Sequence, residues 1–231
     1  MLKAFLKSGI VASVLTLVPL VAGAATFTTA SNYFGGNGSE VAHIYSGSPA
    51  VSTSTLAGGL AMTGPLHGAG NENFTAWCLD IVTTMQKSSS YFITTTPFQT
   101  AMTSTQQSNI QKLFDTGFKG LDLSVNKNSA GFQLALWELM YENASTFLLT
   151  SGNFHVTQTS GLHAISVGQS LLDHLNGPVT QKYALTWLQS DPHTSQNLVT
   201  AAAVPLPAGA VLLISGLGGL AALRRRKARK A

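Results

Sequence analysis

The chain has 231 residues, and the stretch between its two ends is too rich in Phe, Trp, Leu and Ile for a disordered protein. Its formal charge of +4 does not predict nucleic-acid binding, because the cations are concentrated at the ends. Residues 25–204 contain five lysines and all nine acids, a balance of −4. One domain with a hydrophobic core is therefore expected, and no nucleic-acid partner.

Residues 1–24 have the pattern of a secretory signal peptide. Two lysines come first, an apolar run at 10–21 follows, and small residues at 22–24 provide the cleavage site. The run is too short for a comfortable membrane span. The sequence predicts a signal helix that is removed before Ala25, so that the mature protein leaves the cytoplasm.

The next part of the chain has strand character. Residues 25–70 are rich in Gly, Ser, Thr and Ala with scattered apolar positions, which predicts short strands joined by turns. A strand is expected at 74–82 (FTAWCLDIV), where the side chains alternate. Another is expected at 89–98 (SSYFITTTPF), which is β-branched and aromatic.

Three helices and two strands are expected after this. The helices lie within 103–118, capped by Ser104 or Thr105; within 128–143, capped by Asn128 or Ser129; and within 160–178, closed by Gly177 and Pro178. The strands are KYALTWLQS (182–190) and SQNLVTAAAV (195–204). The order predicts an α+β fold over residues 25–203, in which a sandwich-like or barrel-like β-framework is interrupted by a helical segment.

The chain ends in an apolar stretch that is followed at once by cations. Residues 208–223 carry no charge, and six of the next seven residues are Arg or Lys. A helix of this length covers about 24 Å of the roughly 30 Å hydrocarbon layer, and the arginines can reach the head groups. The pattern predicts a transmembrane helix at 208–223 with a basic cytoplasmic tail. A buried helix with a solvated tail is the alternative.

The tail also carries a specific motif. VPLPAG, then an apolar helix with GLGGLAAL, then RRRKARK resembles the sorting signal of exosortase substrates, the PEP-CTERM group in its VPLPA-CTERM variant. The resemblance covers residues 204–231. It implies that an exosortase recognises Val204, Pro205, Leu206 and Pro207, where Leu206 replaces the glutamate of the commoner motif.

This resemblance implies a location as well. Such a protein of a Gram-negative bacterium is anchored in the inner membrane before sorting. It then reaches the cell surface or the extracellular matrix, where it is handled together with exopolysaccharide or biofilm matrix. The sorting signal determines where the protein is delivered, and it does not identify the activity of the domain that it delivers.

Cys78 is the only cysteine, so it cannot form a disulfide within the chain. Gln133 lies among apolar residues of the second expected helix, in what should be its first turn, where its carboxamide is withdrawn from water and needs partners. A small buried cysteine and a satisfied core amide are the simplest interpretation of the two residues.

The pairing of WCLD with FQLALWE resembles the Cys-Gln thioester domains of bacterial surface proteins. It implies that Cys78 and Gln133 form a thioester, with the N-terminus of the helix near Gln133 stabilising the oxyanion. It also implies supporting roles for four neighbours. Asp80 would orient a proton-transfer partner, and three aromatic residues would exclude water: Trp77, Phe132 and Trp137. A turn or strand-edge carboxylate is the alternative for Asp80. Phe132 replaces the threonine that is frequent in Gram-positive members.

Two functions are therefore expected. The first is covalent attachment through the thioester to amines, such as a lysine or an amino sugar, on a surface protein or polysaccharide. The second is a non-reactive structural component of the matrix. A Cys-His hydrolase is a third class, but His155, His163 and His174 lie in no recognisable signature. No enzyme activity, catalytic residue, metal site or cofactor is predicted.

Overall fold

The computed structural model describes residues 24–204, apart from 69, 96–101, 143–145 and 162. Within this part of the chain no helix is long and apolar enough to cross a membrane. The expected signal peptide, except Ala24, and the expected transmembrane helix at 208–223 lie outside the described residues.

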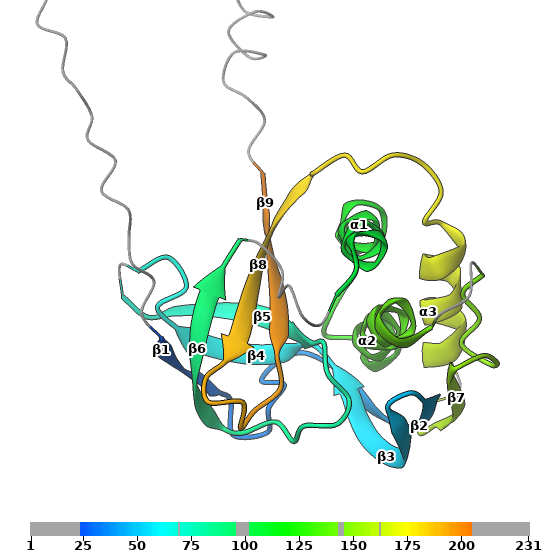
Figure 1. The fold of residues 1–231 in the computed structure, drawn as a ribbon, viewed down its shortest axis with the longest axis horizontal. Helices are drawn as coiled ribbons and strands as arrows, with labels where there is room; N and C mark the ends of the chain where they lie inside the picture. Colours follow the sequence, from blue (N-terminus) through cyan, green and yellow to red (C-terminus); the bar gives the residue numbers. More distant parts are fainter. Residues whose placement is uncertain (1–23, 69, 96–101, 143–145, 162, 205–231) are drawn as a thin grey trace, which may run out of the picture.

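Six strands form a closed antiparallel barrel (Figure 1). In order around the barrel they are β1 (Ala25–Thr29), β4 (Leu60–Gly64), β5 (Glu72–Cys78), β9 (Leu198–Ala203), β8 (Tyr183–Ser190) and β6 (Ser88–Thr94). Pairing of β1 with β6 closes the ring. Buried Phe27 packs edge-on against Phe74 and Tyr91, with ring centroids 5.9 and 5.8 Å away. Gly64 allows this arrangement, because a Cβ there would overlap the Phe27 ring.

A second sheet and the helices lie beside the barrel (Figure 1). The sheet has the order β3 (Ala50–Gly58), β2 (Ser39–Gly47), β7 (Phe154–Thr159). The helices are α1 (Ser104–Leu113), which continues into the π-helical turn η1 (Phe114–Phe118), α2 (Asn126–Tyr141) and α3 (Ala164–Asp173). Helices α2 and α3 approach closely at Gly131 and Gly168, where a Cβ on either residue would collide with the other's backbone.

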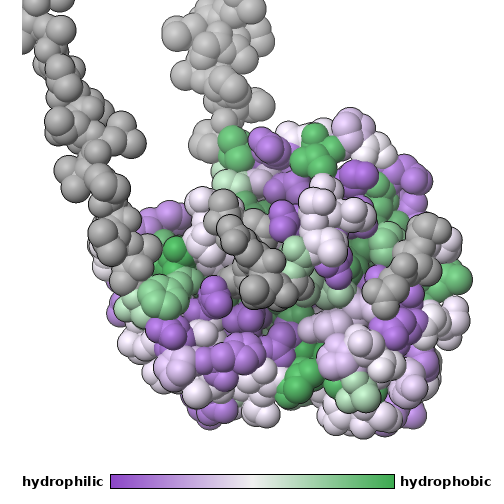
Figure 2. Space-filling view, in the orientation of Figure 1, coloured by the Kyte–Doolittle hydropathy of each residue, from purple (hydrophilic) through white to green (hydrophobic). Residues whose placement is uncertain are grey.

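Helix α2 is the centre of the core. Every residue from Ser129 to Met140 is buried, because the helix packs against both β3 and β2 and against α1 and α3. In Figure 2 hydrophobic residues form separate small patches on the face shown. The apolar content of the sequence is thus placed mainly in the interior.

The predicted α+β class and barrel-like framework are confirmed, but several boundaries were wrong. Strand β5 ends at Cys78, because the backbone N–H groups of Val82 and Thr83 donate to the Asp80 carboxylate and form a turn. Strand β7 was not predicted at all.

The helix ends also differ from the prediction. Thr103 caps α1 through a reciprocal capping box with Gln106. Helix α2 begins at Asn126 without a side-chain cap, so Gln133 lies about two turns inside it rather than in its first turn. Helix α3 ends at Asp173, before the expected Gly177 and Pro178.

A buried carboxylate fixes the segment that leads into β8. Asp115 in η1 accepts hydrogen bonds of 2.8–2.9 Å from the backbone N–H groups of Thr180, Gln181 and Lys182, and one of 3.0 Å from the Gln111 amide. Burial alone would raise the pKa of Asp115, but these hydrogen bonds outweigh it and lower the pKa. The ionised carboxylate therefore joins η1 to the start of β8.

Changing Asp115 to Asn is expected to reduce the free energy of unfolding by about 2 kcal/mol, because an NH2 group then faces N–H donors. Since the pKa of Asp115 is lowered in the folded chain, its contribution is present above the unfolded pKa and is lost as the pH falls. Urea unfolding at pH 7 measures the change. Asp173→Asn, at an exposed position, is the control and should cost less than about 0.5 kcal/mol. Equal losses in both variants would contradict this role of Asp115.

Candidate functional site

The two residues of the expected thioester are 55 positions apart in sequence and lie together in the core. The backbone N–H of Cys78 donates to Oε1 of Gln133 at 2.9 Å, and Nε2 of Gln133 donates to the Cys78 carbonyl oxygen at 2.8 Å. Gln133 is fully buried and Cys78 is 7% exposed. The two hydrogen bonds hold the carboxamide against the residue that carries the thiol.

Secondary structure sets up this contact. Cys78 is the last residue of β5, paired with Leu198 of β9, and Gln133 lies on the middle of α2. One turn before Gln133, the Ser129 hydroxyl accepts a hydrogen bond of 2.9 Å from the Gly59 backbone N–H just before β4. Residues four apart share one helix face, so the same face of α2 is joined to the barrel at two points.

The electrostatic surroundings keep the thiol protonated. Burial, with a smaller contribution from the Asp80 charge, raises the pKa of Cys78 far above its usual value. In the chain without the cross-link, the residue that the neutral carboxamide contacts therefore carries a neutral thiol. Any bond between them requires the thiol proton to leave as the sulfur attacks.

The turn after Cys78 is held by residues that the sequence analysis did not single out. The Tyr141 hydroxyl donates to the Leu79 carbonyl at 3.0 Å and accepts from the Ile81 N–H at 3.3 Å. The Gln196 amide donates to the Asp80 carbonyl at 2.9 Å. These backbone contacts cannot be identified from one sequence, because they pair side chains with main-chain atoms far away along the chain.

Asp80 fits the turn role that the sequence left open. Its Oδ1 accepts from the N–H groups of Val82 and Thr83, at 3.0 and 2.7 Å. Its Oδ2 has no hydrogen bond in the described structure and lies 3.7 Å from Nε2 of His193. No cluster of three or more His, Cys, Asp or Glu residues that could hold a metal ion is found in the part of the chain that the structure describes.

The three expected water-excluding aromatics separate into two groups. Trp77 and Phe132 are buried against each other with centroids 4.5 Å apart, and Trp77 points to the face of β5 opposite Cys78. They therefore cover the face of β5 that is opposite the Cys78 side chain. Trp137 lines the same pocket as Cys78.

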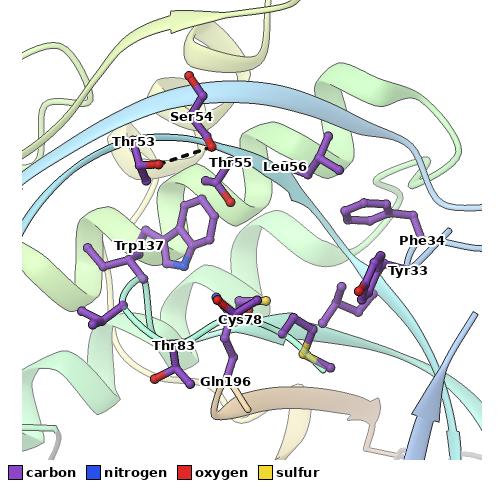
Figure 3. Close-up of a pocket in the computed structure, with 15 residues that line it drawn as sticks. Tyr33, Phe34, Thr53, Ser54, Thr55, Leu56, Cys78, Thr83, Trp137 and Gln196 are labelled. Atoms are coloured by element: carbon purple, nitrogen blue, oxygen red, sulfur yellow. Dashed lines mark hydrogen bonds between the residues drawn. The ribbon is translucent and has the colours of Figure 1, made fainter. Parts of the chain in front are cut away.

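This pocket has a volume of about 450 Å³ (Figure 3). Its other lining residues come mainly from two segments, Thr53–Leu56 of β3 and Ile81–Met85 after β5, together with Tyr33, Phe34, Leu60 and Gln196. Figure 3 shows Thr53 and Thr55 on one side, Cys78, Thr83 and Gln196 on the other, and Trp137 between them. Gln133 does not line the pocket, so the thiol side is the open side of the pair.

The expected sorting motif is only partly within the described residues. Val204 follows β9, is 46% exposed and donates its N–H to the Lys182 carbonyl at 2.9 Å. Residues 205–207, the rest of the motif, lie outside the described part of the chain.

No family model and no curated protein matches the sequence. Among solved structures, the chain is similar to the N-terminal domain of the Streptococcus pyogenes pilus tip adhesin Cpa, with a TM-score of 0.43 and 16% identity. That match covers 64% of this chain and 85% of the adhesin domain.

Two further similar structures carry the thioester name. One is the N-terminal thioester domain of a surface protein from Clostridium perfringens, with a TM-score of 0.43, 11% identity, and coverage of 63% of this chain and 89% of that one. The other is the N-terminal thioester domain of the fibronectin-binding protein SfbI from Streptococcus pyogenes, with a TM-score of 0.44 and 12% identity. That match covers 79% of this chain and 94% of the SfbI domain. The structural neighbours are thus domains of a pilus tip adhesin, a surface protein and a fibronectin-binding protein of bacteria, and their sequence identities and TM-scores are too low to assign this chain to a family.

Proposed function

We propose that this domain forms an internal thioester between Sγ of Cys78 and Cδ of Gln133, and that the thioester couples the protein to amines outside the cell. The observation that carries the proposal is the pair of hydrogen bonds between the Gln133 carboxamide and the Cys78 backbone. They support the proposal because they hold the Gln133 carboxamide, whose Cδ is the electrophilic carbon, in contact with the residue that carries the only thiol of the sequence.

The same hydrogen bonds support the chemistry of bond formation. As the Cys78 sulfur attacks Cδ, negative charge develops on Oε1, which already accepts the Cys78 N–H at 2.9 Å. The Cδ–Nε2 bond breaks, the thiol proton ends on the departing nitrogen, and ammonia leaves. This N–H takes the oxyanion role that the sequence analysis gave to the helix N-terminus, which is about two turns from Gln133.

The stored thioester supports attachment to a partner. An amine nitrogen attacks Cδ, the Cδ–Sγ bond breaks, and one amine proton returns to the sulfur, so a stable amide replaces the thioester. Burial of Gln133 and the aromatic layer behind β5 limit competition from water. The domain reacts once and is therefore not an enzyme.

The proposal includes the route to the site of action. The N-terminal signal exports the chain, residues 208–223 hold it in the inner membrane, and an exosortase recognises Val204 to Pro207. The protein then acts at the cell surface or in the matrix of a Gram-negative bacterium, on an amine-bearing surface protein or polysaccharide. The exposed Val204 at the end of the described domain is compatible with access to the motif.

A second candidate is a non-reactive structural protein of the extracellular matrix. The observation that favours it is that Gln133 is already satisfied by two hydrogen bonds, as a purely structural buried amide would be. In this case Cys78 remains a buried thiol throughout the life of the protein.

Intact mass separates the two candidates. We expect the purified chain to be lighter by one ammonia than its processed sequence, to have no thiol that maleimide titrates after unfolding, and to gain the mass of one methylamine on incubation. Cys78→Ala should abolish the mass deficit and the uptake of methylamine, because no sulfur is left to attack, and Gln133→Ala should in addition restore one titratable thiol. The closest control for Cys78→Ala, Cys78→Ser, retains the size of the side chain but offers only a weak nucleophile.

A wild-type chain of unmodified mass with one titratable thiol would exclude the thioester and leave the structural protein. Methylamine uptake by Cys78→Ala would show that the reactive group lies elsewhere.

A further inference from the structure

The pocket beside Cys78 has the size of a ligand site. Its volume of about 450 Å³ is within the range of small-molecule pockets. One wall is Thr53–Leu56 of β3, an edge strand in the described sheet, and the facing wall is the segment that follows Cys78. A molecule bound here lies against the sulfur side of the Cys78–Gln133 pair.

The lining is polar but uncharged. Among the described residues that line the pocket, none is Lys, Arg, His, Asp or Glu. Hydroxyl and amide groups come from both walls, at Thr53, Thr55, Thr83, Thr84 and Gln196. Such groups both donate and accept hydrogen bonds, and together with the aromatic rings of Tyr33 and Trp137 they suit a ligand rich in hydroxyl groups.

A buried donor in the pocket has no partner. Trp137 is 2% exposed, and its Nε1 makes no hydrogen bond in the described structure. In Figure 3 the indole nitrogen lies on the side of the ring that faces Cys78. An indole N–H can only donate, so it needs an acceptor such as a ligand hydroxyl oxygen.

The amine that attacks a thioester must be uncharged. A lysine with a pKa near 10.4 is uncharged in only about one molecule in 2,500 at pH 7. The described residues that line the pocket include neither a carboxylate to bind the ammonium group nor a base to remove its proton. The neighbouring oxygens of an amino sugar withdraw electrons and lower the pKa of its amine, so far more of it is uncharged at neutral pH.

We infer that this pocket binds a hexosamine unit with a free amino group, and that such a sugar is the acceptor of the thioester. The inference rests on the proposed function. The sugar nitrogen forms the new bond to Cδ of Gln133, the Cδ–Sγ bond breaks, and one amine proton passes to the Cys78 sulfur. In this arrangement one hydroxyl group of the sugar accepts a hydrogen bond from the indole N–H of Trp137. Another forms a hydrogen bond with the hydroxyl of Thr55, on the pocket wall opposite Cys78 (Figure 3).

Adduct formation by the full chain, followed by intact mass, tests the inference with three amines. These are a glucosamine oligomer, Nα-acetyl-lysine methylamide and methylamine, each at several concentrations. We expect the rate with the glucosamine oligomer to saturate, and to exceed the lysine rate at least about tenfold at equal low concentration. The rate with methylamine, which is too small to use the pocket walls, should rise linearly.

Trp137→Phe removes the indole donor and retains an aromatic ring. It should lower the ratio of the glucosamine rate to the methylamine rate about fivefold. The matched control is Trp187→Phe, a buried tryptophan of β8 outside this pocket, which should leave the ratio unchanged.

The outcomes distinguish the inference from the function on which it rests. If no amine reacts, the proposed thioester is wrong and the inference falls with it. If methylamine reacts but glucosamine does not saturate, lysine reacts faster, or Trp137→Phe leaves the ratio unchanged, the thioester stands and the sugar acceptor is wrong.

Discussion

Replacing Gln133 with alanine is expected to lower the free energy of unfolding by about 3–5 kcal/mol. The substitution leaves a cavity in a fully buried part of α2 and removes the partners of both the N–H and the carbonyl of Cys78. The measurement is urea unfolding in a Cys78→Ala background, so that no cross-link contributes. Gln158→Ala, at an exposed position of β7, is the control and should cost less than about 0.5 kcal/mol.

Gln133→Glu distinguishes the hydrogen bonds from the size of the side chain. When protonated, the new carboxyl can accept from the Cys78 N–H and donate to its carbonyl, as the amide does. Burial should raise its pKa above the unfolded value of about 4.3, so this variant loses stability as the pH rises from that value. A variant as stable at pH 8 as at pH 4, or a Gln133→Ala loss no larger than its control, would contradict the structural role of Gln133.

The pair at the site could be predicted from sequence because its signal is local. Cys78 and Gln133 each lie in a short motif, and each motif can be recognised without knowledge of the fold. The geometry around them could not be predicted in the same way. Asn128 or Ser129 was expected to cap the helix, but the Ser129 hydroxyl accepts a hydrogen bond from the Gly59 N–H, and the helix begins earlier without a side-chain cap. A tertiary hydrogen bond thus replaced the local one on which the capping rule depends.

The pocket lies beyond sequence reasoning for a related reason. The pocket forms only because residues of the edge strand β3 lie opposite the turn after Cys78. The predicted barrel-like framework did not include β7, whose six residues follow a turn between two helices and pair with β2. Without β7 the three-stranded sheet is incomplete, so the position of β3 relative to Cys78 could not be derived.

The amino-acid composition does not show which acidic residues are buried in the fold. The sequence gives nine acids, and solvated positions are their usual place. Glu138, one turn after Leu134 on α2, is instead fully buried: its Oε1 accepts from the Leu148 N–H at 2.7 Å, and its Oε2 has no hydrogen bond in the described structure. Burial, with a smaller contribution from Glu142, raises the pKa of Glu138 to about 8, although the Leu148 hydrogen bond opposes this.

Glu138 should therefore make the fold less stable as the pH rises. Between the ordinary pKa of 4.5 and about 8, the unfolded chain releases the proton that the folded chain keeps. At about 1.4 kcal/mol per pH unit, the loss between pH 5 and 8 is about 3 kcal/mol. Glu138→Gln should abolish this slope in urea unfolding across that range, whereas Asp173→Asn should retain it. If Glu138→Gln loses as much stability as the wild type between pH 5 and 8, another group is responsible for the slope.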